Sequence, residues 1–304
     1  MPLWGLFRRT RRLPAIRTGE WEQARREGRS LEEQQRWQRR YLQDVPYALP
    51  KDEAEIDRLN FQHYALMSVQ KQHIIAPLED YPRAILDVGC GTGLWAREVG
   101  QRYPLCRVVG VDVEPPERLP TVPANVDYVY GDVLKGLPFA ENSFDLVHQR
   151  LLILAVPAQS WPQVLGELLR LARPGGWLQL TEAGMYFNRP GPSSARLRDL
   201  VNRAIAGWGF DPLIALNLPA LLAQAGAVAV EKRTYGVLMG EAGGQGGRLL
   251  EKDMLAVMSA LTERVAAFMP VEEWRELLAS LPEEWRTYGT EFEFHVTVGR
   301  KPLR

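Results

Sequence analysis

The sequence has little cysteine, no net charge and no long apolar run. Its 304 residues include only two cysteines, Cys90 and Cys106, so no disulfide framework is possible and a reducing, cytoplasmic setting is expected. The 37 basic residues equal the 37 acidic ones, whereas a dedicated nucleic-acid-binding domain would be strongly basic. No stretch approaches the roughly 20 apolar residues of a transmembrane helix. We therefore expect a globular protein that binds neither nucleic acid nor a membrane.

The charge balance conceals an uneven distribution. The first 40 residues hold eleven arginines and five glutamates, a net charge of +6 that the rest of the chain offsets. A basic segment of this kind could meet nucleic acid or anionic lipid. Its interleaved glutamate and arginine and its widely spaced apolar residues favour instead a solvated helix with a narrow apolar stripe. We interpret residues 1–44 as a charged helical arm that packs against its own chain or joins subunits of a homo-oligomer.

After the arm, the pattern changes twice. Residues 45–80 begin with a proline-flanked extended stretch and continue as a helix with its N-cap near Asp52, which we interpret as an N-terminal helical cap segment. From residue 81 on, short apolar runs alternate with helical patterns. The predicted strands are 84–88, 107–112, 126–130, 144–147 and 177–180, and the predicted helices are 94–103 and 160–173. This alternation predicts an α/β domain with a parallel sheet covered on both faces, whose ligands bind at the carboxyl ends of the strands.

Beyond the fifth predicted strand the pattern is mixed. The domain extends over 81–304, and two stretches in it are interpreted as lid insertions, about 185–222 and 240–288. We expect a strand at 228–235. The last run, 291–298, alternates strictly, which predicts an antiparallel strand with an exposed polar face. The glycine-rich run 243–247 is interpreted as a flexible connector.

The most informative motif is a glycine-rich turn between a strand and a helix. Gly89, Gly91 and Gly93 occupy alternate positions. Such a turn lets backbone N–H groups approach a ligand more closely than a Cβ would permit. A dinucleotide-binding turn would need glycine where this chain has Leu94. The preceding acid, Asp87, would lie badly beside a pyrophosphate but suits a ligand with an ammonium group.

Two further acids are expected at strand ends. Asp112 lies 19 residues beyond Gly93, where a carboxylate can accept from both hydroxyl groups of a ribose. Asp132 can accept from the exocyclic amine of an adenine. Together with Asp87, these acids suit a ligand with ammonium, ribose and adenine but no phosphate, which describes S-adenosylmethionine.

Five motifs in chain order carry a family resemblance. They are Asp87–Gly93, Gly110–Asp112, Gly131–Asp132, Asn142–Val147 and Arg173–Trp177. They resemble the successive motifs of class I S-adenosylmethionine-dependent methyltransferases. The resemblance implies a Rossmann-like, doubly wound sheet of seven strands with the last one antiparallel. It implies S-adenosyl-L-methionine as cofactor, held by Asp87, Gly89, Cys90, Gly91, Gly93, Asp112, Val113, Asp132, Val133 and Gln149.

A narrower resemblance covers roughly residues 45–300. The segment Tyr47–His63, together with Val147–Arg150, is similar to a methyltransferase subgroup that includes regulators of fungal secondary metabolism and bacterial natural-product tailoring enzymes. Members of this subgroup differ widely in substrate. The resemblance therefore indicates a fold and a cofactor rather than one reaction.

Three residues are candidates for catalysis. His148 is expected just beyond the fourth strand, where it could deprotonate a hydroxyl or an amine, or instead hydrogen-bond the backbone beneath the cofactor. For His63, on the N-terminal helix, catalysis competes with a structural role that ties this helix to the sheet. Tyr47 could close over the cofactor, meet the substrate or belong to the core. The scattered histidines and cysteines have no metal-ligand spacing, so no metal is expected.

The substrate is expected between the N-terminal segment, the lid and the sheet edge. Aromatic residues in the lid favour a flat or apolar small molecule, although packing on the core explains each of them equally well: Tyr186, Phe187, Trp208 and Phe210.

The main functional hypothesis is in-line methyl transfer to a small, aromatic or apolar natural product, with positioning of the acceptor supplying much of the rate. Two alternatives stay open. Cyclisation or rearrangement could accompany or replace methylation, or the chain could be a regulator that binds the cofactor without turnover.

Overall fold

The computed structural model describes residues 48–49, 53–78, 81–116 and 121–303. The chain divides into two units, Met1–Arg40 and Tyr41–Arg304, and all described residues belong to the second. The predicted arm, Tyr47 and Asp52 lie outside the described residues.

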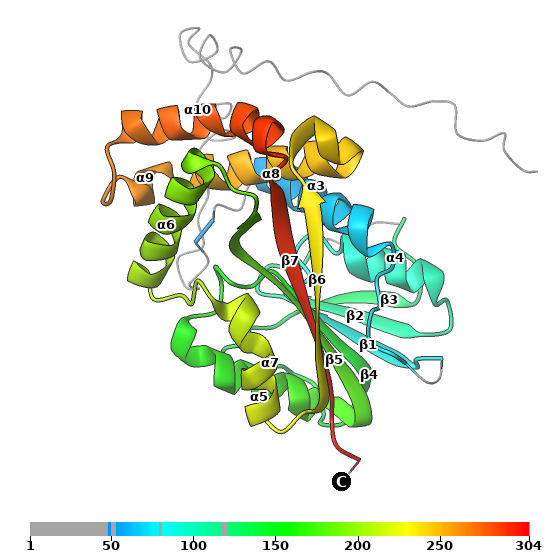
Figure 1. Cartoon of the computed structure of the whole chain (residues 1–304). Coiled ribbons are helices and arrows are strands. Elements are labelled where there is room, and N and C mark those ends of the chain that lie inside the picture. Colours follow the sequence, from blue (N-terminus) through cyan, green and yellow to red (C-terminus); the bar gives the residue numbers. More distant parts are fainter. Residues whose placement is uncertain (1–47, 50–52, 79–80, 117–120, 304) are drawn as a thin grey trace, which may run out of the picture. The chain divides into compact units, whose positions relative to one another are not determined.

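A seven-stranded sheet forms the centre of the second unit (Figure 1). Its strands are β1 (Ala84–Val88), β2 (Arg107–Asp112), β3 (Val126–Tyr130), β4 (Phe144–Arg150), β5 (Ala172–Asn188), β6 (Val228–Leu238) and β7 (Glu291–Arg300). They lie in the order β3-β2-β1-β4-β5-β7-β6. Strands β1 to β5 pair in parallel, and β7 pairs antiparallel with both β5 and β6. The predicted doubly wound sheet with an antiparallel last strand is confirmed.

Three strands extend beyond the apolar runs that predicted them. β4 continues to Arg150, β5 is 17 residues long, and β6 continues to Leu238. Polar side chains in these extensions are buried, for example Gln149 and Glu182. The apolar pattern therefore marked only the central part of each strand.

Helices cover both faces of the sheet. On one face α4 (Leu94–Arg102) packs Trp95 and Val99 into an apolar cluster with the sheet. On the other face lie α5 (Trp161–Leu171) and α7 (Ile214–Gln224). The sequence placed α7 in a lid, but it contacts β5, β6 and β7. His295 and Thr297 of β7 are buried, so the predicted exposed face of this strand was wrong.

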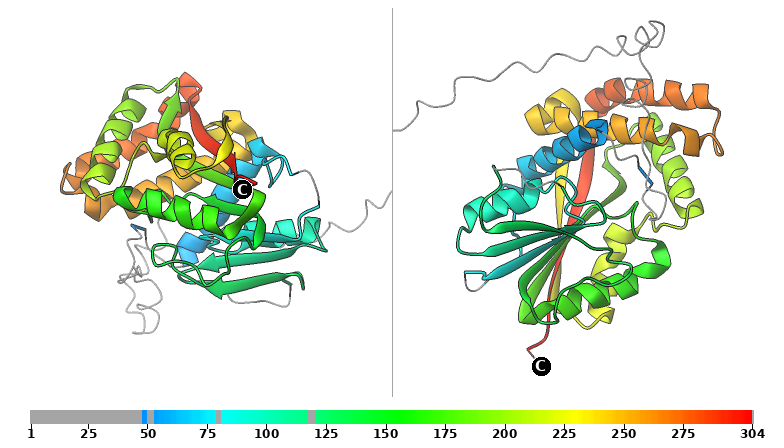
Figure 2. Two further views of the ribbon diagram at one scale, coloured as in Figure 1. Left: turned by 90° about the horizontal axis from the view of Figure 1, so that it is seen from below. Right: turned by 180° about the vertical axis from the view of Figure 1, so that it is seen from behind.

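The remaining helices gather beyond the ends of β5 and β6 (Figure 1 and Figure 2). They are α3 (Glu53–Gln70), α6 (Pro192–Gly207), α8 (Gly244–Ala260), α9 (Thr262–Val265) and α10 (Val271–Tyr288), with short 3-10 helices at Ala158–Ser160 and Gly240–Gly243. α3 packs along α8. None of the described helices has the length and apolar character that crossing a membrane requires.

The glycine-rich run 243–247 leads into the first turn of α8 rather than forming a flexible connector. A Cβ at Gly246 would collide with the Ser68 hydroxyl on α3. A Cβ at Gly247 would collide with the carbonyl oxygens of Leu238 and Gly240. Glycine here permits the close approach of α8 to α3 and β6.

Candidate functional site

A cavity of about 230 Å³ lies at the carboxyl ends of the strands, between the glycine turn, α3, α6 and α8. Its polar part is formed by the segments that follow β1, β2, β3 and β4. Seven of the residues predicted to bind the cofactor line this part: Gly89, Cys90, Gly91, Asp112, Val113, Asp132 and Val133. The topology thus brings residues from three strand ends to one edge, as the sequence predicted.

Each glycine of the turn has a left-handed backbone. The φ angles of Gly89, Gly91 and Gly93 are 67°, 55° and 70°, which side chains with a Cβ rarely adopt. A Cβ at Gly93 would lie 2.5 Å from the Tyr128 ring, and one at Gly89 would lie 2.6 Å from Leu152. The backbone conformation therefore favours glycine at all three positions, and the Tyr128 ring adds a steric reason at Gly93.

The N–H groups of the turn bond within the protein. Gly89 and Cys90 donate to the Val111 carbonyl at 2.8 and 3.1 Å. Gly91 donates to Oδ2 of Asp112 at 2.9 Å. These three N–H groups fix the turn against β2, so a ligand meets the surface of the turn rather than these donors.

The two strand-end carboxylates are held by local hydrogen bonds. Asp112 accepts a backbone N–H bond at each oxygen, both 2.9 Å long. Asp132 accepts from the N–H of Leu134 at 3.0 Å and forms an ion pair with Lys135 at 3.0 Å. Both groups are therefore held in a fixed orientation at the cavity wall.

Asp87 and His148 lie outside the cavity wall, on the α4 face of the sheet. His148 belongs to β4 rather than to the loop beyond it, and it is 1% exposed. Its Nδ1 is 2.7 Å from Oδ1 of Asp87, and its ring stacks on Trp95 with centroids 3.7 Å apart. Burial lowers the pKa of His148, so a neutral ring donates to Asp87. The expected place of His148 just beyond the fourth strand was wrong, since it lies within β4 and its partner is a side chain beneath the turn.

Gln149 is also away from the cavity wall, on the opposite face of β4. Its Nε2 donates to Glu182 at 2.5 Å. Glu182 accepts from the N–H groups of Leu152 and Ile153 at 2.7 and 3.2 Å, and burial raises its pKa to about 8. The Gln149–Glu182 pair therefore supports the loop 151–156, which does line the cavity.

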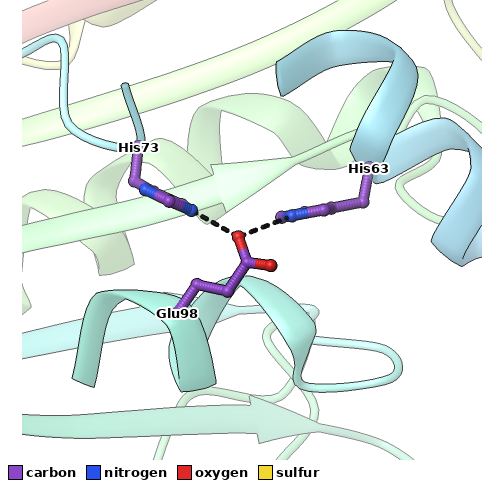
Figure 3. A group of neighbouring side chains, drawn as sticks. All are labelled: His63, His73 and Glu98. Carbon is purple, nitrogen blue, oxygen red and sulfur yellow. Dashed lines mark hydrogen bonds and ion pairs between the residues drawn. The ribbon is translucent and has the colours of Figure 1, made fainter. Parts of the chain in front are cut away.

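His63 belongs to a cluster that joins α3, the segment after it and α4 (Figure 3). Nε2 of His63 and Nε2 of His73 lie 3.0 and 2.6 Å from the same oxygen of Glu98. Burial opposes ionisation of Glu98, but these hydrogen bonds hold its pKa below the usual value. On the other side of the His63 ring, Nη1 of Arg150 is 3.2 Å from Nδ1.

The partner on Nδ1 fixes the protonation of His63. Because arginine only donates, Nδ1 of His63 accepts from Arg150, and Nε2 must carry the proton that Glu98 accepts. The ligand atoms of His63, His73 and Glu98 all lie within 4.8 Å of one another, close enough for a metal ion. A protonated Nε2, however, has no lone pair for a metal. The cluster is a hydrogen-bond network, and it gives His63 a structural place behind the cavity wall.

A buried ionic group was missed by the sequence analysis. Arg58 on α3 forms 2.7 Å ion pairs with Glu55 and with Asp253 on α8. Gln62 donates to the same Asp253 at 3.3 Å. Burial raises the pKa of Asp253, and the positive charge of Arg58 partly offsets this increase. Arg58, Gln62 and Asp253 line the cavity. Arg58 and Asp253 are 195 residues apart in the sequence, so no local motif could predict that they pair.

The four aromatic residues predicted in the lid do not line the cavity. Tyr186 and Phe187 lie within β5, and the Tyr186 hydroxyl donates to the Pro212 carbonyl at 3.0 Å. Trp208 packs against the core and Phe210 is buried in it. The apolar part of the cavity is lined instead by aliphatic and methionine side chains with two phenylalanines of β7: Met185, Val201, Ile205, Met254, Val257, Met258, Leu261, Phe292 and Phe294.

Comparison with known proteins gives consistent matches. Residues 85–176 match the family model described as a methyltransferase domain. The chain is 30% identical over 280 residues to methyltransferase pytC of Aspergillus terreus, covering 84% of this chain and 83% of that one. It is 28% identical over 274 residues to N-methyltransferase sirN of Leptosphaeria maculans, covering 86% of this chain and 96% of that one. Among solved structures, phosphoethanolamine N-methyltransferase 2 of Haemonchus contortus with S-adenosyl-L-methionine matches at 16% identity and a TM-score of 0.47, over 80% of this chain and 52% of that one.

Proposed function

Because this chain belongs to the S-adenosylmethionine-dependent methyltransferases, we propose that it methylates a small, largely apolar natural-product-type molecule bound beside the cofactor. The observation that carries the proposal is one cavity with two chemically different parts. Oriented carboxylates lie at the strand ends, and the rest of the wall consists mainly of aliphatic and methionine side chains of α6 and α8 with the phenylalanines of β7. The first part suits an adenosine group and the second an apolar acceptor.

The polar part fits the cofactor by the chemistry of its donor set. Asp112 at the end of β2 would hold the ribose, and Asp132 after β3 would hold the adenine amine. Their own hydrogen bonds hold both carboxylates in place before a ligand arrives. When bound, S-adenosylmethionine supplies an electrophilic methyl group on a sulfonium centre. The chain's own contribution is to orient that group toward the apolar part of the cavity.

We propose a nitrogen atom as acceptor, in line with the methyl group. Among the relatives, sirN is named an N-methyltransferase. Asp253 and Gln62 are polar side chains in the wall that α3 and α8 contribute, and their oxygens can accept from an N–H group. Transfer to a neutral amine depends on positioning rather than on a base. This agrees with the absence of histidine among the described residues that line the cavity.

Calorimetry with S-adenosylhomocysteine tests the cofactor site. Asp112→Ala should weaken binding by about tenfold or more, because it removes a charged hydrogen-bond acceptor. Asp57→Ala is the control, since Asp57 is an exposed aspartate of α3. An unaltered affinity in Asp112→Ala would overturn the assignment of this part of the cavity.

Mass spectrometry of reactions with a panel of apolar amines tests the reaction. A product that is heavier by one methyl group is expected. A rearranged product without the added methyl would show cyclisation in place of transfer. Cofactor binding without any product, together with a stoichiometric protein partner, would show a regulator.

A further inference from the structure

Arg150 occupies a distinctive place at the end of β4. Strands β1 and β4 pair in register up to Val88 and Gln149, so the next residues, Gly89 and Arg150, lie side by side. Because side chains alternate along a strand, Arg150 points to the same face as His148, toward α3 and α4. Its side chain lines the cavity. A cation thus stands beside the glycine turn at the inner end of the polar part.

The guanidinium of Arg150 has more donors than partners. It carries five N–H donors, and among the described residues its one hydrogen bond is the 3.2 Å bond to Nδ1 of His63. The carboxylates of Asp87 and Glu98 favour the charged form of Arg150, but among the described residues neither forms an ion pair with it. A half-buried arginine with unused donors at a cavity wall calls for an anionic acceptor, and a carboxylate fits its planar fork best.

The position of this cation is fixed from behind. His63 accepts a hydrogen bond from Arg150. It donates to Glu98, which His73 also contacts (Figure 3). The network therefore orients Arg150 through His63 without neutralising it by direct contact. Such preorganisation is typical of a residue that binds a charged group.

The order of the strands indicates which end of a ligand reaches Arg150. Asp132, Asp112, the glycine turn and Arg150 lie at or just beyond the carboxyl ends of β3, β2, β1 and β4, which are consecutive neighbours in the sheet. With neighbouring strands about 4.8 Å apart, the row spans about 14 Å. A ligand whose adenine and ribose lie at Asp132 and Asp112 would place its far end at Arg150. In S-adenosylmethionine that end is an amino acid with a carboxylate.

We propose that Arg150 binds the carboxylate of the cofactor's amino-acid end, and that His63 is the positioning residue that orients Arg150. The inference rests on the proposed function. It assigns to the last residue of β4 the recognition that distinguishes the intact cofactor from an adenosine thioether without a carboxylate.

The test compares two ligands by calorimetry: S-adenosylhomocysteine and its decarboxylated analogue, which keeps the amine and lacks the carboxylate. The wild-type protein should bind S-adenosylhomocysteine about 10- to 100-fold more tightly, which is the usual contribution of a hydrogen-bonded charged group. Arg150→Gln should lose this preference by weakening only the carboxylate ligand. Arg150→Lys should keep part of it, and His63→Gln should reduce it with little effect on the analogue. Arg102→Gln, at the exposed end of α4, is the control.

Each other outcome overturns the inference in a distinct way. Equal affinities of the wild-type protein for the two ligands would refute it without any variant, even if Arg150→Gln failed to fold. If Arg150→Gln bound both ligands more weakly by the same factor, Arg150 would support the cavity wall without recognising the carboxylate. Unchanged binding of both, with a raised KM for the acceptor, would assign Arg150 to a substrate carboxylate. Failure of the wild-type protein to bind S-adenosylhomocysteine at all would instead refute the proposed cofactor site.

Discussion

The imidazole of His148 lies flat on the indole of Trp95, with ring centroids 3.7 Å apart and planes 4° apart. Trp95 is in α4, just after the glycine turn, and Asp87, which accepts from His148, is in β1, just before it. His148 therefore connects both flanks of the turn from beneath. His148, which the sequence suggested as a general base, is thus held by Asp87 and Trp95 in a structural role.

Replacing His148 should change stability and leave the pH dependence of kcat unaltered. His148→Phe keeps a ring against Trp95 but leaves the Asp87 carboxylate buried without its donor. We expect a loss of about 1–3 kcal/mol in the free energy of unfolding, measured by urea denaturation. Asp87→Asn, which retains an acceptor, should cost less. A stable His148→Phe protein with a shifted pH–rate profile would restore His148 as the base.

Glu182 should make the stability depend on pH. Burial raises the pKa of Glu182 to about 8, so between pH 4.5 and about 8 the native state holds a proton that the unfolded state releases. The free energy of unfolding should therefore fall as pH rises through this window, with a slope of up to about 1.4 kcal/mol per pH unit. Glu182→Gln should remove this contribution. Denaturation curves of both proteins from pH 5 to 9 that run parallel would contradict the prediction.

The fold and the polar edge of the cavity could be predicted because their signals are local. Buried strands appear as short apolar runs, and the glycines and acids stand at fixed offsets from strand ends. The sequence His148-Gln149-Arg150 shows where this reasoning fails. Three polar residues resemble a loop, yet they continue β4, because each forms a hydrogen bond with a side chain from a distant part of the chain: Asp87, Glu182 and His63.

The acceptor side of the cavity depends on packing that no local pattern reveals. α7 resembles a lid helix in sequence, yet it packs on β7 and buries the strand's polar face. The ion pair of Arg58 with Asp253 joins α3 to α8 across nearly the whole domain. The sequence analysis predicted that aromatic residues of the lid bind the substrate, whereas methionines and aliphatic residues of α6 and α8 line the cavity.

Gly93→Ala should damage the turn for two separable reasons. The left-handed φ of 70° should cost about 1–2 kcal/mol for a residue with a Cβ, and contact with Tyr128 should add to this. We expect lower thermal stability and weaker binding of S-adenosylhomocysteine. Gly209→Ala has a left-handed φ of 86° with open space around the Cβ, so it measures the backbone cost alone. Equal losses in the two variants would show that contact with Tyr128 has no effect.

Met258→Trp should separate acceptor binding from cofactor binding. Met258 is 2% exposed and lines the apolar part of the cavity from α8, together with Phe292 and Phe294. The bulky indole ring of a tryptophan would fill space that the proposed acceptor occupies, while Asp112 and the glycine turn keep their places. We expect kcat/KM for the acceptor to fall by about tenfold or more, as for loss of 1–3 kcal/mol of apolar contact, with the Kd for S-adenosylhomocysteine unchanged.

The matched control for this variant is Met258→Leu, because a swap of similar volume keeps the cavity apolar and costs little stability. It should leave both constants near their wild-type values. A Met258→Trp protein that loses S-adenosylhomocysteine binding would show that the two parts of the cavity are not independent. Unchanged kcat/KM in the folded variant would place the acceptor elsewhere, because a tryptophan and a substrate cannot occupy the same part of a cavity of about 230 Å³.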